Sequence, residues 1–432
     1  MIVSVSGIRG ILNADMSLAD VVRFSDNFAS LTGSAEVLIA RDTRRTSPIL
    51  GRAVTAALVG RGVAVVDFGA VSTPALFRES LQRGKPAVMV TASHNEPEYN
   101  GLKFIIDGRG IGKDAFERVT QPRRGAGEPV LQGRVRKATA RYVDDLVKRF
   151  GQNSCQGVKV ALDLGGGAAI AHAVPLLRRL GCEVTSVNDT PGVFSRRIDP
   201  TADGLELLRR LVKAKDCDIG LAFDCDGDRL VIVDSAGRKR AGDYMLTLAL
   251  AQLLAESKEE NVVVSVDTTQ AVDIVAARAG ARVLRSKVGE ANVVGMMTES
   301  GARFGGEGSS GGLVDGSFNY CRDSLLAALV IIRALRHRRR KLYDDVRSFH
   351  QSRAAIQAPR AKALRAIETL ASKNPGADRT DGLKLWLSRR SWVLIRVSGT
   401  EDSVRVSAEA EAAGKAAQIT QTFSNKLKEL CR

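Results

Sequence analysis

The stretch DIGLAFDCDGDRLVIVD, residues 218–234, decides the fold of this chain. Two apolar runs, 218–224 and 229–234, flank a short loop that is rich in acidic residues, and such runs are typical of buried strands. Elsewhere in the chain, similar runs alternate with segments of helical periodicity. This alternation predicts α/β units with mixed, mostly parallel sheets rather than a β-sandwich or a helix bundle.

Outward from this stretch, the alternation recurs in three series. The strand-like segments are 37–42, 63–69, 86–93, 158–167, 218–224, 229–234 and 262–267. Helices are expected from Pro48, near 170–180 and after Asp243. Three similar α/β domains are therefore expected, at residues 1–152, 153–252 and 253–352.

The pattern changes near the C-terminus. A helix is expected near 361–372, followed by a polar break at 373–382, the strand-like segments LKLWL, SWVLIRV and SVRVSAEA, and a closing helix. This order is typical of an antiparallel sheet covered by helices. We therefore expect a small α+β domain at residues 353–432.

The chain has 432 residues, of which 44% are hydrophobic, enough to give several domains a core. Residues 1–10 do not show a basic leader followed by an apolar segment. The longest apolar run, 325–332, ends at Arg333. We expect no membrane span and no secretion signal. Six scattered cysteines without a C-x-x-C pair favour the reducing cytoplasm.

The formal net charge is +16, which favours acidic partners, either nucleic acid or a phosphorylated small molecule. The densest basic stretch, RALRHRRRK at 333–341, follows an apolar helical segment and contains no aromatic residue. Proteins that bind single strands usually offer aromatic stacking platforms. We interpret this stretch as a solvated helix end and expect no nucleic-acid partner.

The acidic loop predicts a metal site. Asp224, Asp226 and Asp228 occupy alternate positions between the two apolar runs, and carboxylates this close repel one another without a cation. Their hard oxygen atoms suit Mg²⁺ or Ca²⁺. An EF-hand does not fit, because its sixth and twelfth positions are Arg229 and Ser235. The alternative is an acidic hairpin turn without a metal.

A serine follows another strand-like run, in TASHN at 91–95, with NGLK at 100–103 shortly after it. Ser93 can present its hydroxyl at the edge of the sheet, while His94 and Lys103 supply a proton carrier and a cation. Because no G-x-S-x-G elbow surrounds this serine, a serine protease triad is a poor alternative. A capped turn of ordinary turn residues is the simpler alternative.

Two more polar clusters interrupt the scaffold. GGEGSSGG at 305–312 combines backbone freedom with one carboxylate and two hydroxyls, which suits a ligand that carries hydroxyl groups, although a flexible linker has a similar composition. RVSGT at 396–400, with Arg405 beyond it, offers a guanidinium, two hydroxyls and backbone amides. Such a set can hold a phosphate dianion.

Together and in this order, the four motifs resemble those of the α-D-phosphohexomutase superfamily. TASHN with NGLK is similar to its phosphoserine loop, DCDGDR to its metal loop, GGEGSSGG to its sugar loop and RVSGTED to its phosphate loop. The resemblance spans nearly the whole chain. It implies three α/β domains and a mobile fourth domain around one central cleft.

The resemblance also implies roles for single residues. Ser93 carries the phosphoryl group, Lys103 transfers a proton with help from His94, and Arg9 contacts the phosphoserine. Mg²⁺ is expected on the phosphoserine and on Asp224, Asp226 and Asp228. A hexose 1,6-bisphosphate is expected as intermediate and activator. The expected substrate contacts are Arg229, Lys287, Glu307, Ser309, Arg396, Ser398, Gly399 and Thr400.

The identity of the sugar depends on details of two loops. The SGTE form of the phosphate loop resembles phosphoglucosamine mutases, but Asp402 replaces the proline that often follows it. In the sugar loop, Ser310 and Gly311 replace the glycine and histidine of the usual G-E-x-S-G-H. That loop is closer to the G-E-G-N-G-G form of some archaeal-type mutases, with Ser309 in place of asparagine. We expect conversion of glucosamine 6-phosphate to glucosamine 1-phosphate, ahead of mannose or glucose phosphates.

The expected partner is a small phosphosugar, and the protein is expected to be a monomer or homodimer. A non-catalytic phosphosugar sensor or a basic nucleic-acid binder on the same fold is the alternative from another class. The presence of Ser93, Lys103 and the three aspartates of the acidic loop weighs against a sensor that has lost its chemistry.

Overall fold

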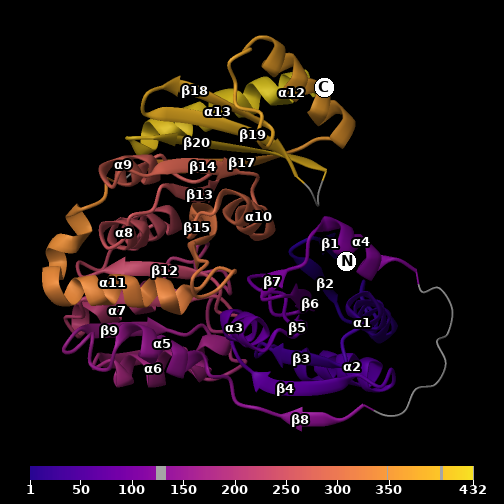
Figure 1. The fold of residues 1–432 in the computed structure, drawn as a ribbon. Helices are drawn as coiled ribbons and strands as arrows, with labels where there is room; N and C mark the ends of the chain where they lie inside the picture. The colour runs from indigo at the N-terminus through magenta and orange to yellow at the C-terminus, as the bar shows by residue number, and fades with distance from the viewer. Residues whose placement is uncertain (123–132, 348, 399–401, 432) are drawn as a thin grey trace.

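The computed structural model describes residues 1–122, 133–347, 349–398 and 402–431. The chain forms four sheets with their own helices, and these four domains follow one another in an arc (Figure 1). The expectation of three α/β domains and a C-terminal α+β domain is confirmed. In the described part of the chain, no helix is both long enough and apolar enough to span a membrane.

Domain I contains a mixed sheet in the order β1-β2-β6-β5-β3-β4-β8, with β7 paired to β6. Its strands are β1 (Ile2–Ser4), β2 (Gly7–Ile11), β3 (Glu36–Arg41), β4 (Ala64–Ala70), β5 (Ala87–Val90), β6 (Tyr99–Ile106), β7 (Arg109–Gly110) and β8 (Val135–Lys137). Its helices are α1 (Leu18–Thr32), α2 (Ser47–Val59), α3 (Thr73–Arg83) and α4 (Lys113–Thr120). Every residue of β5 is buried, as expected for a central strand covered on both faces.

Domain II has the sheet order β10-β9-β11-β12, in which β10, β9 and β11 are parallel and β12 is antiparallel. Its strands are β9 (Lys159–Asp163), β10 (Glu183–Val187), β11 (Ile219–Phe223) and β12 (Leu230–Asp234). Its helices are α5 (Tyr142–Phe150), η1 (Ala168–Ala171), α6 (Ala173–Arg179) and α7 (Glu206–Ala214). The helix expected near 170–180 is thus a 3₁₀ turn followed by a short α-helix.

Domain III repeats this topology with the order β14-β13-β15-β16, and its last strand is again antiparallel. Its strands are β13 (Asn261–Ser265), β14 (Arg282–Ser286), β15 (Phe304–Glu307) and β16 (Gly312–Asp315). Its helices are α8 (Gly242–Ala255), α9 (Ala271–Arg278), α10 (Glu290–Ser300), η2 (Gly308–Ser310), α11 (Ser324–Arg338) and η3 (Arg339–Asp344). The acidic loop and the glycine-rich loop therefore occupy equivalent positions, as the connections β11–β12 and β15–β16.

Domain IV is an antiparallel sheet in the order β17-β20-β19-β18. Its elements are β17 (His350–Gln357), α12 (Arg360–Ser372), β18 (Leu383–Ser388), β19 (Ser391–Val397), β20 (Ser403–Ala410) and α13 (Ala413–Leu430). The expected domain boundary at 352/353 falls inside β17, and the one at 252/253 falls inside α8.

The hydrophobic cores explain how the domains are held together. The largest cluster of buried side chains runs from domain I through domains II and III, so these three domains pack against one another. Domain IV has its own core. It joins domain III through a small cluster of Val266, Trp392 and Leu394, with Val288 packed against it.

Candidate active site

Ser93 lies in the turn that follows β5, where the chain leaves the sheet. Its φ of 53° is uncommon for a residue other than glycine, so the turn needs partners that hold it. The Ser93 amide donates to Thr91 Oγ1 at 2.8 Å, and Arg44 Nη2 donates to the Ser93 carbonyl at 2.7 Å. Arg44 is fully buried and paired with Asp42. These contacts hold the serine at the edge of the sheet.

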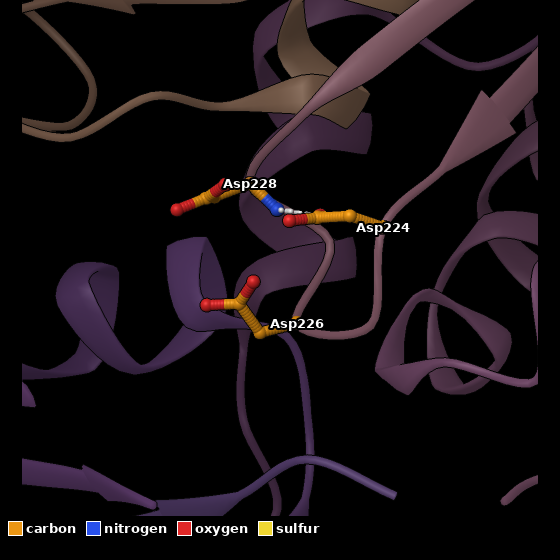
Figure 2. Close-up of side chains that lie close together, drawn as sticks. All are labelled: Asp224, Asp226 and Asp228. Atoms are coloured by element: carbon orange, nitrogen blue, oxygen red, sulfur yellow. Dashed lines mark hydrogen bonds between the residues drawn. The ribbon is translucent and has the colours of Figure 1, made fainter. Parts of the chain in front are cut away.

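The acidic loop meets this serine directly. Ser93 Oγ donates a hydrogen bond to Asp224 Oδ2 over 3.1 Å, so the two motifs form one site. Figure 2 shows that Asp224, Asp226 and Asp228 come from one loop and gather around a common space. Each offers an oxygen atom within 4.8 Å of the others, and all three side chains are buried.

The oxygen atoms of this loop fit a divalent cation. Asp224 Oδ1 accepts the amides of Asp228 and Arg229, at 3.2 Å each. In contrast, the Oδ1 atoms of Asp226 and Asp228 are buried and have no hydrogen-bond partner in the described part of the chain. Burial, together with the two neighbouring carboxylates, raises the pKa of Asp224 well above its ordinary value. A cation bound here would satisfy both oxygen atoms and offset the repulsion, and an all-oxygen donor set beside a serine suits Mg²⁺.

Lys103 lies on β6 opposite Met89 of β5, and this register carries its side chain to the acidic loop. Its Nζ donates to Asp226 Oδ2 at 2.7 Å and to Asp228 Oδ2 at 2.9 Å. Burial lowers the pKa of Lys103, but these two carboxylates outweigh burial and raise it above the ordinary value. Lys103 is therefore protonated in this arrangement.

His94 lies against the serine hydroxyl, and the charges of two arginines, Arg229 and Arg9, act on its imidazole. His94 Nδ1 lies 3.4 Å from Ser93 Oγ, and its Nε2 lies 3.4 Å from Arg229 Nη2. Burial, then Arg229 and Arg9, lower the pKa of His94 far below its ordinary value, so the imidazole is neutral. Arg9 on β2 donates to Asn95 Oδ1 at 2.8 Å. Burial and Arg229 lower the pKa of Arg9 to about 10.

The glycine-rich loop places Glu307 at the end of β15. Its Oε1 accepts the Gly289 amide at 2.7 Å, and its Oε2 lies 3.2 Å from Arg322 Nη1. Arg322 also contacts Asp228 Oδ2 at 2.8 Å and Glu290 Oε2 at 3.2 Å. This arginine therefore joins the acidic loop to the glycine-rich loop.

The fourth motif lies on β19 and β20. Arg396 and Arg405 are directly opposite each other in the antiparallel register. Like charges in this position are destabilising unless an anion lies between them. Arg396 Nε pairs with Asp381 at 2.8 Å, and Ser398 is buried beside the strand end. The other two expected residues of this loop, Gly399 and Thr400, lie outside the described residues.

A cavity of about 560 Å³ connects these four clusters, and residues from all four domains line it. Of the expected residues, its lining includes Arg9, His94, Lys103, Arg229, Glu307, Ser309 and Arg396. Lys287 is exposed and is not part of this lining, although its neighbours Val288 and Gly289 are. Ser93 and the three aspartates are buried beneath the cavity floor, beside His94 and Lys103.

Sequence reasoning missed several charged residues of this cavity. Arg322 stands just before α11 outside the four motifs, and Asp199, which pairs with Arg229 at 3.0 Å, precedes a proline in a loop. Asp267 and Arg353 also line the cavity. A carboxylate directly after the apolar run of β13 was a signal for Asp267, because ligands gather at the carboxyl ends of parallel strands.

Comparison with known proteins identifies the fold family. Models of the phosphoglucomutase/phosphomannomutase family match four segments: alpha/beta/alpha domain I at 1–122, domain II at 140–237, domain III at 241–352 and the C-terminal domain at 354–426. Together these segments cover most of the chain.

Individual relatives agree with these models. The chain is 32% identical to a probable phosphoglucosamine mutase of Methanopyrus kandleri, over 97% of this chain and 96% of that protein. It is 29% identical to a phosphoglucomutase/phosphomannomutase of Thermococcus kodakarensis, over 98% and 97%. A crystal structure of a family protein from Burkholderia thailandensis superimposes with a TM-score of 0.85 at 25% identity, covering 99% and 98%. The chain therefore belongs to the phosphoglucomutase/phosphomannomutase family and is a phosphohexomutase, an isomerase that acts on hexose phosphates.

Proposed function

We propose that this phosphohexomutase interconverts hexose 6-phosphate and hexose 1-phosphate through a phosphoserine at Ser93. The observation that carries the proposal is the 3.1 Å contact between Ser93 Oγ and Asp224 Oδ2. The contact brings the serine hydroxyl to the loop that carries three buried carboxylates. His94 lies against the same hydroxyl, and Lys103 pairs with two of the three carboxylates. A serine surrounded in this way is suited to carry a phosphoryl group.

The proposed transfer has two half-reactions of opposite direction. In the first, the free hydroxyl of the sugar phosphate attacks the phosphorus on Ser93, the new P–O bond forms, and the bond to Ser93 Oγ breaks. The hydroxyl proton ends on Ser93 Oγ. The product is a hexose 1,6-bisphosphate, which turns around and returns its other phosphoryl group to Ser93 by the reverse exchange. The isomeric monophosphate then leaves.

The proton needs a carrier between these two oxygen atoms. His94 is neutral and lies 3.4 Å from Ser93 Oγ, and Lys103 lies against the same acidic loop. We propose Lys103 as the main carrier with help from His94. The ion pairs with Asp226 and Asp228 raise the pKa of Lys103, so the lysine does not release its proton easily. The proposed role therefore requires that another cation take the place of Lys103 as partner of the two carboxylates.

Asp224, Asp226 and Asp228 would hold that cation, Mg²⁺, together with an oxygen of the phosphoserine. When bound, Mg²⁺ supplies positive charge that offsets the negative charge of the transferring phosphoryl group. Arg9 and Arg229 line the cavity, interact with the charges of the acidic loop and add positive charge there. Water has to be excluded from this site, since water could otherwise take the phosphoryl group.

The far end of the cavity orients the sugar phosphate. Glu307 and Ser309 are proposed to bind sugar hydroxyls. Arg396 and Ser398, with Gly399 and Thr400, are proposed to bind the phosphate that does not react in a given half-reaction. The opposed pair of Arg396 and Arg405 supports this assignment, because a phosphate dianion between them would neutralise both charges. Lys287 remains a candidate for a further contact.

Glucosamine 6-phosphate is the proposed substrate, ahead of mannose and glucose phosphates. The SGTE sequence at 398–401 supports this preference. The Methanopyrus relative carries the name of a phosphoglucosamine mutase, whereas the similarly distant Thermococcus relative carries the name of a phosphoglucomutase/phosphomannomutase. A side-by-side assay on the three hexose phosphates, with Mg²⁺ and a catalytic amount of bisphosphate, decides between them.

We also propose that the protein works in the cytoplasm, as a monomer or homodimer. Its six cysteines are all free thiols, which supports a reducing compartment. The basic segment at 333–341 contributes to the +16 charge, but we assign it no nucleic-acid partner. Salt-sensitive binding of an oligonucleotide at physiological ionic strength would contradict that assignment.

The role of Ser93 is tested with Ser93→Ala. The matched control is Ser30→Ala on α1, a serine that does not line the cavity. After incubation with bisphosphate, intact mass should show one added phosphate on the wild type and the control, and none on Ser93→Ala. Turnover should be lost in Ser93→Ala alone. Mutase activity that survives in Ser93→Ala refutes the phosphoserine, and a wild type without phosphate or turnover favours a non-catalytic phosphosugar sensor.

A further inference from the structure

Asp267 is a carboxylate that the sequence motifs did not single out, and it lies beside the sugar loop. It stands two residues after β13, and β13 pairs in parallel with β15, whose last residue is Glu307. Parallel strands end at the same edge of a sheet, so both side chains reach the cavity, and both line it.

The position of Asp267 is fixed by hydrogen bonds to its own turn. Ser265 Oγ donates to Asp267 Oδ1 at 2.7 Å and lies 2.9 Å from Thr268 Oγ1. Thr268 Oγ1 also accepts the amide of Gly308, at 3.1 Å, which belongs to the sugar loop. The Asp267 carboxylate is therefore held at a set place relative to Glu307.

The second oxygen atom, Asp267 Oδ2, has no hydrogen bond or ion pair with the part of the chain that the structure describes, where the side chain of Asp267 is bonded through Oδ1 alone. Three arginines that line the same cavity lie against other carboxylates. Arg353 lies 3.7 Å from Asp243, Arg396 pairs with Asp381 at 2.8 Å, and Arg322 contacts three other carboxylates. Asp267 is 8% exposed and lines the cavity, so a ligand in the cavity can reach its carboxylate.

Glu307 differs from Asp267 in this respect, because both of its carboxylate oxygens have partners, the Gly289 amide and Arg322. Burial raises the pKa of Glu307, Arg322 opposes that change, and the charge of Asp267 adds to it. Two carboxylates thus face the sugar end of the cavity close enough to repel each other, and one of them is unpaired. A ligand with a positive charge at this end would offset the repulsion between the two carboxylates and would pair with the free oxygen of Asp267.

We propose that Asp267 determines the substrate class by binding the ammonium group of a 2-amino-2-deoxyhexose phosphate. This inference rests on the proposed hexose phosphate mutase reaction and adds a residue for sugar specificity. An ammonium group donates a hydrogen bond to Asp267 Oδ2 that is strengthened by the opposite charges of the two groups. A neutral hydroxyl in the same position donates a weaker hydrogen bond. An N-acetylated amino sugar lacks the charge and loses the same interaction.

The test compares Asp267→Asn with the wild type on glucosamine 6-phosphate, glucose 6-phosphate and mannose 6-phosphate. Asparagine keeps the size of the side chain and the acceptor for Ser265, but it removes the charge. We expect kcat/KM for glucosamine 6-phosphate to fall about 10- to 100-fold, with changes below about threefold for the two neutral sugars. Asp273→Asn is the matched control, because Asp273 lies on α9 of the same domain, pairs with Arg285 and does not line the cavity.

Equilibrium binding separates this inference from the mutase proposal. Ser93→Ala protein, which needs no turnover, should bind glucosamine 6-phosphate more tightly than glucose 6-phosphate or N-acetylglucosamine 6-phosphate. Adding Asp267→Asn should remove that preference. Equal affinities for the three ligands, or an equal loss on all three sugars in the kinetic test, overturn the role of Asp267 and leave the phosphoserine intact. Preferential binding by a wild type that is never phosphorylated supports Asp267 and refutes the mutase mechanism.

Discussion

Ser93 Oγ donates to Asp224 Oδ2 although 131 residues separate the two positions in the chain. A second contact between the same domains holds this arrangement. Thr73, at the start of α3 in domain I, donates from its Oγ1 to Asp226 Oδ2 at 2.6 Å and from its amide to the Asp226 carbonyl at 2.8 Å. These contacts hold the turn of Ser93 and the acidic loop in fixed positions relative to each other.

Magnesium should stabilise the protein through the acidic loop. Because Asp226 Oδ1 and Asp228 Oδ1 have no partner, a cation that binds there favours the folded state by mass action. We expect Mg²⁺ to raise the Tm of the wild type by several degrees, and Asp228→Asn to lose most of that shift. Thermal unfolding across an Mg²⁺ titration measures this shift, with Asp144→Asn, at an exposed side chain of α5, as control. An equal shift in all three proteins would place the bound ion elsewhere.

Lys103→Met should slow proton transfer. The side chain is replaced by one of similar length without the amine, and general acid–base groups typically contribute about 10²- to 10⁴-fold to rate. We expect kcat to decrease by a factor in that range. Intact mass should show that bisphosphate still phosphorylates Ser93, but more slowly than in the wild type. Lys113→Met, an exposed lysine on α4 that pairs with Glu117, is the control. A kcat within about twofold of the wild type contradicts the role.

Arg322→Met should disturb two loops at once. Arg322 pairs with Asp228 of the acidic loop and Glu307 of the glycine-rich loop, and its loss leaves both buried carboxylates without that partner. Breaking a buried ion pair from one side typically costs about 3–5 kcal/mol. We expect a lower unfolding midpoint in urea, together with a higher KM and a lower kcat. Arg322→Lys should recover part of the stability, because one ammonium can replace some of these contacts but lacks the planar fork.

Arg303→Met is the control for Arg322→Met, because Arg303 is partly exposed and pairs with Asp315 outside the cavity. This control can lose stability, but its KM and kcat should stay close to the wild type. If Arg322→Met and Arg303→Met change stability and kinetics in the same proportion, Arg322 acts through folding alone.

Much of the fold was predictable because its strands carry their own signals. SWVLIRV and SVRVSAEA are the strands β19 and β20 with the same bounds, and the apolar runs around the acidic loop are β11 and β12. In contrast, β17 went unpredicted. Its sequence, HQSRAAIQ, is largely polar and mostly not buried, so no hydrophobic pattern marks it. It is a strand because its backbone pairs with β20 over eight residues, a contact that local sequence does not encode.

The site shows the same division. Its motif residues stand at strand ends with recognisable turn chemistry, so Ser93 and the three aspartates could be expected to meet. Arg322 and Asp199 could not be expected, because each is placed by contacts with residues far away in the chain: Arg322 reaches Asp228 across 94 positions, and Asp199 reaches Arg229 across 30. Single charges outside a motif carry no local sign of such pairing.

Lys384 should make the attachment of domain IV depend on pH. It lies on β18, is 1% exposed and donates from Nζ to the Val266 carbonyl of domain III at 2.7 Å. Burial, then Arg285, lower its pKa to about 7 from the ordinary 10.5. Between these values the unfolded chain holds the proton and the folded one does not, so stability rises with pH across this window. Below about pH 7 the cost of burying the charged amine is present in full.

Lys384→Met isolates this effect, because methionine is similar in length and does not titrate. The two tryptophans of the chain, Trp386 and Trp392, both lie in domain IV, so their fluorescence reports unfolding of this domain. Their ring centroids lie 5.2 and 4.3 Å from the Lys384 amine. Between about pH 7 and pH 9, we expect the wild type to gain about 2 kcal/mol of unfolding free energy relative to the variant. The absolute difference also contains the lost bond to Val266, so the slope with pH is the diagnostic quantity. Parallel pH profiles for the two proteins would mean that Lys384 keeps its proton in the fold.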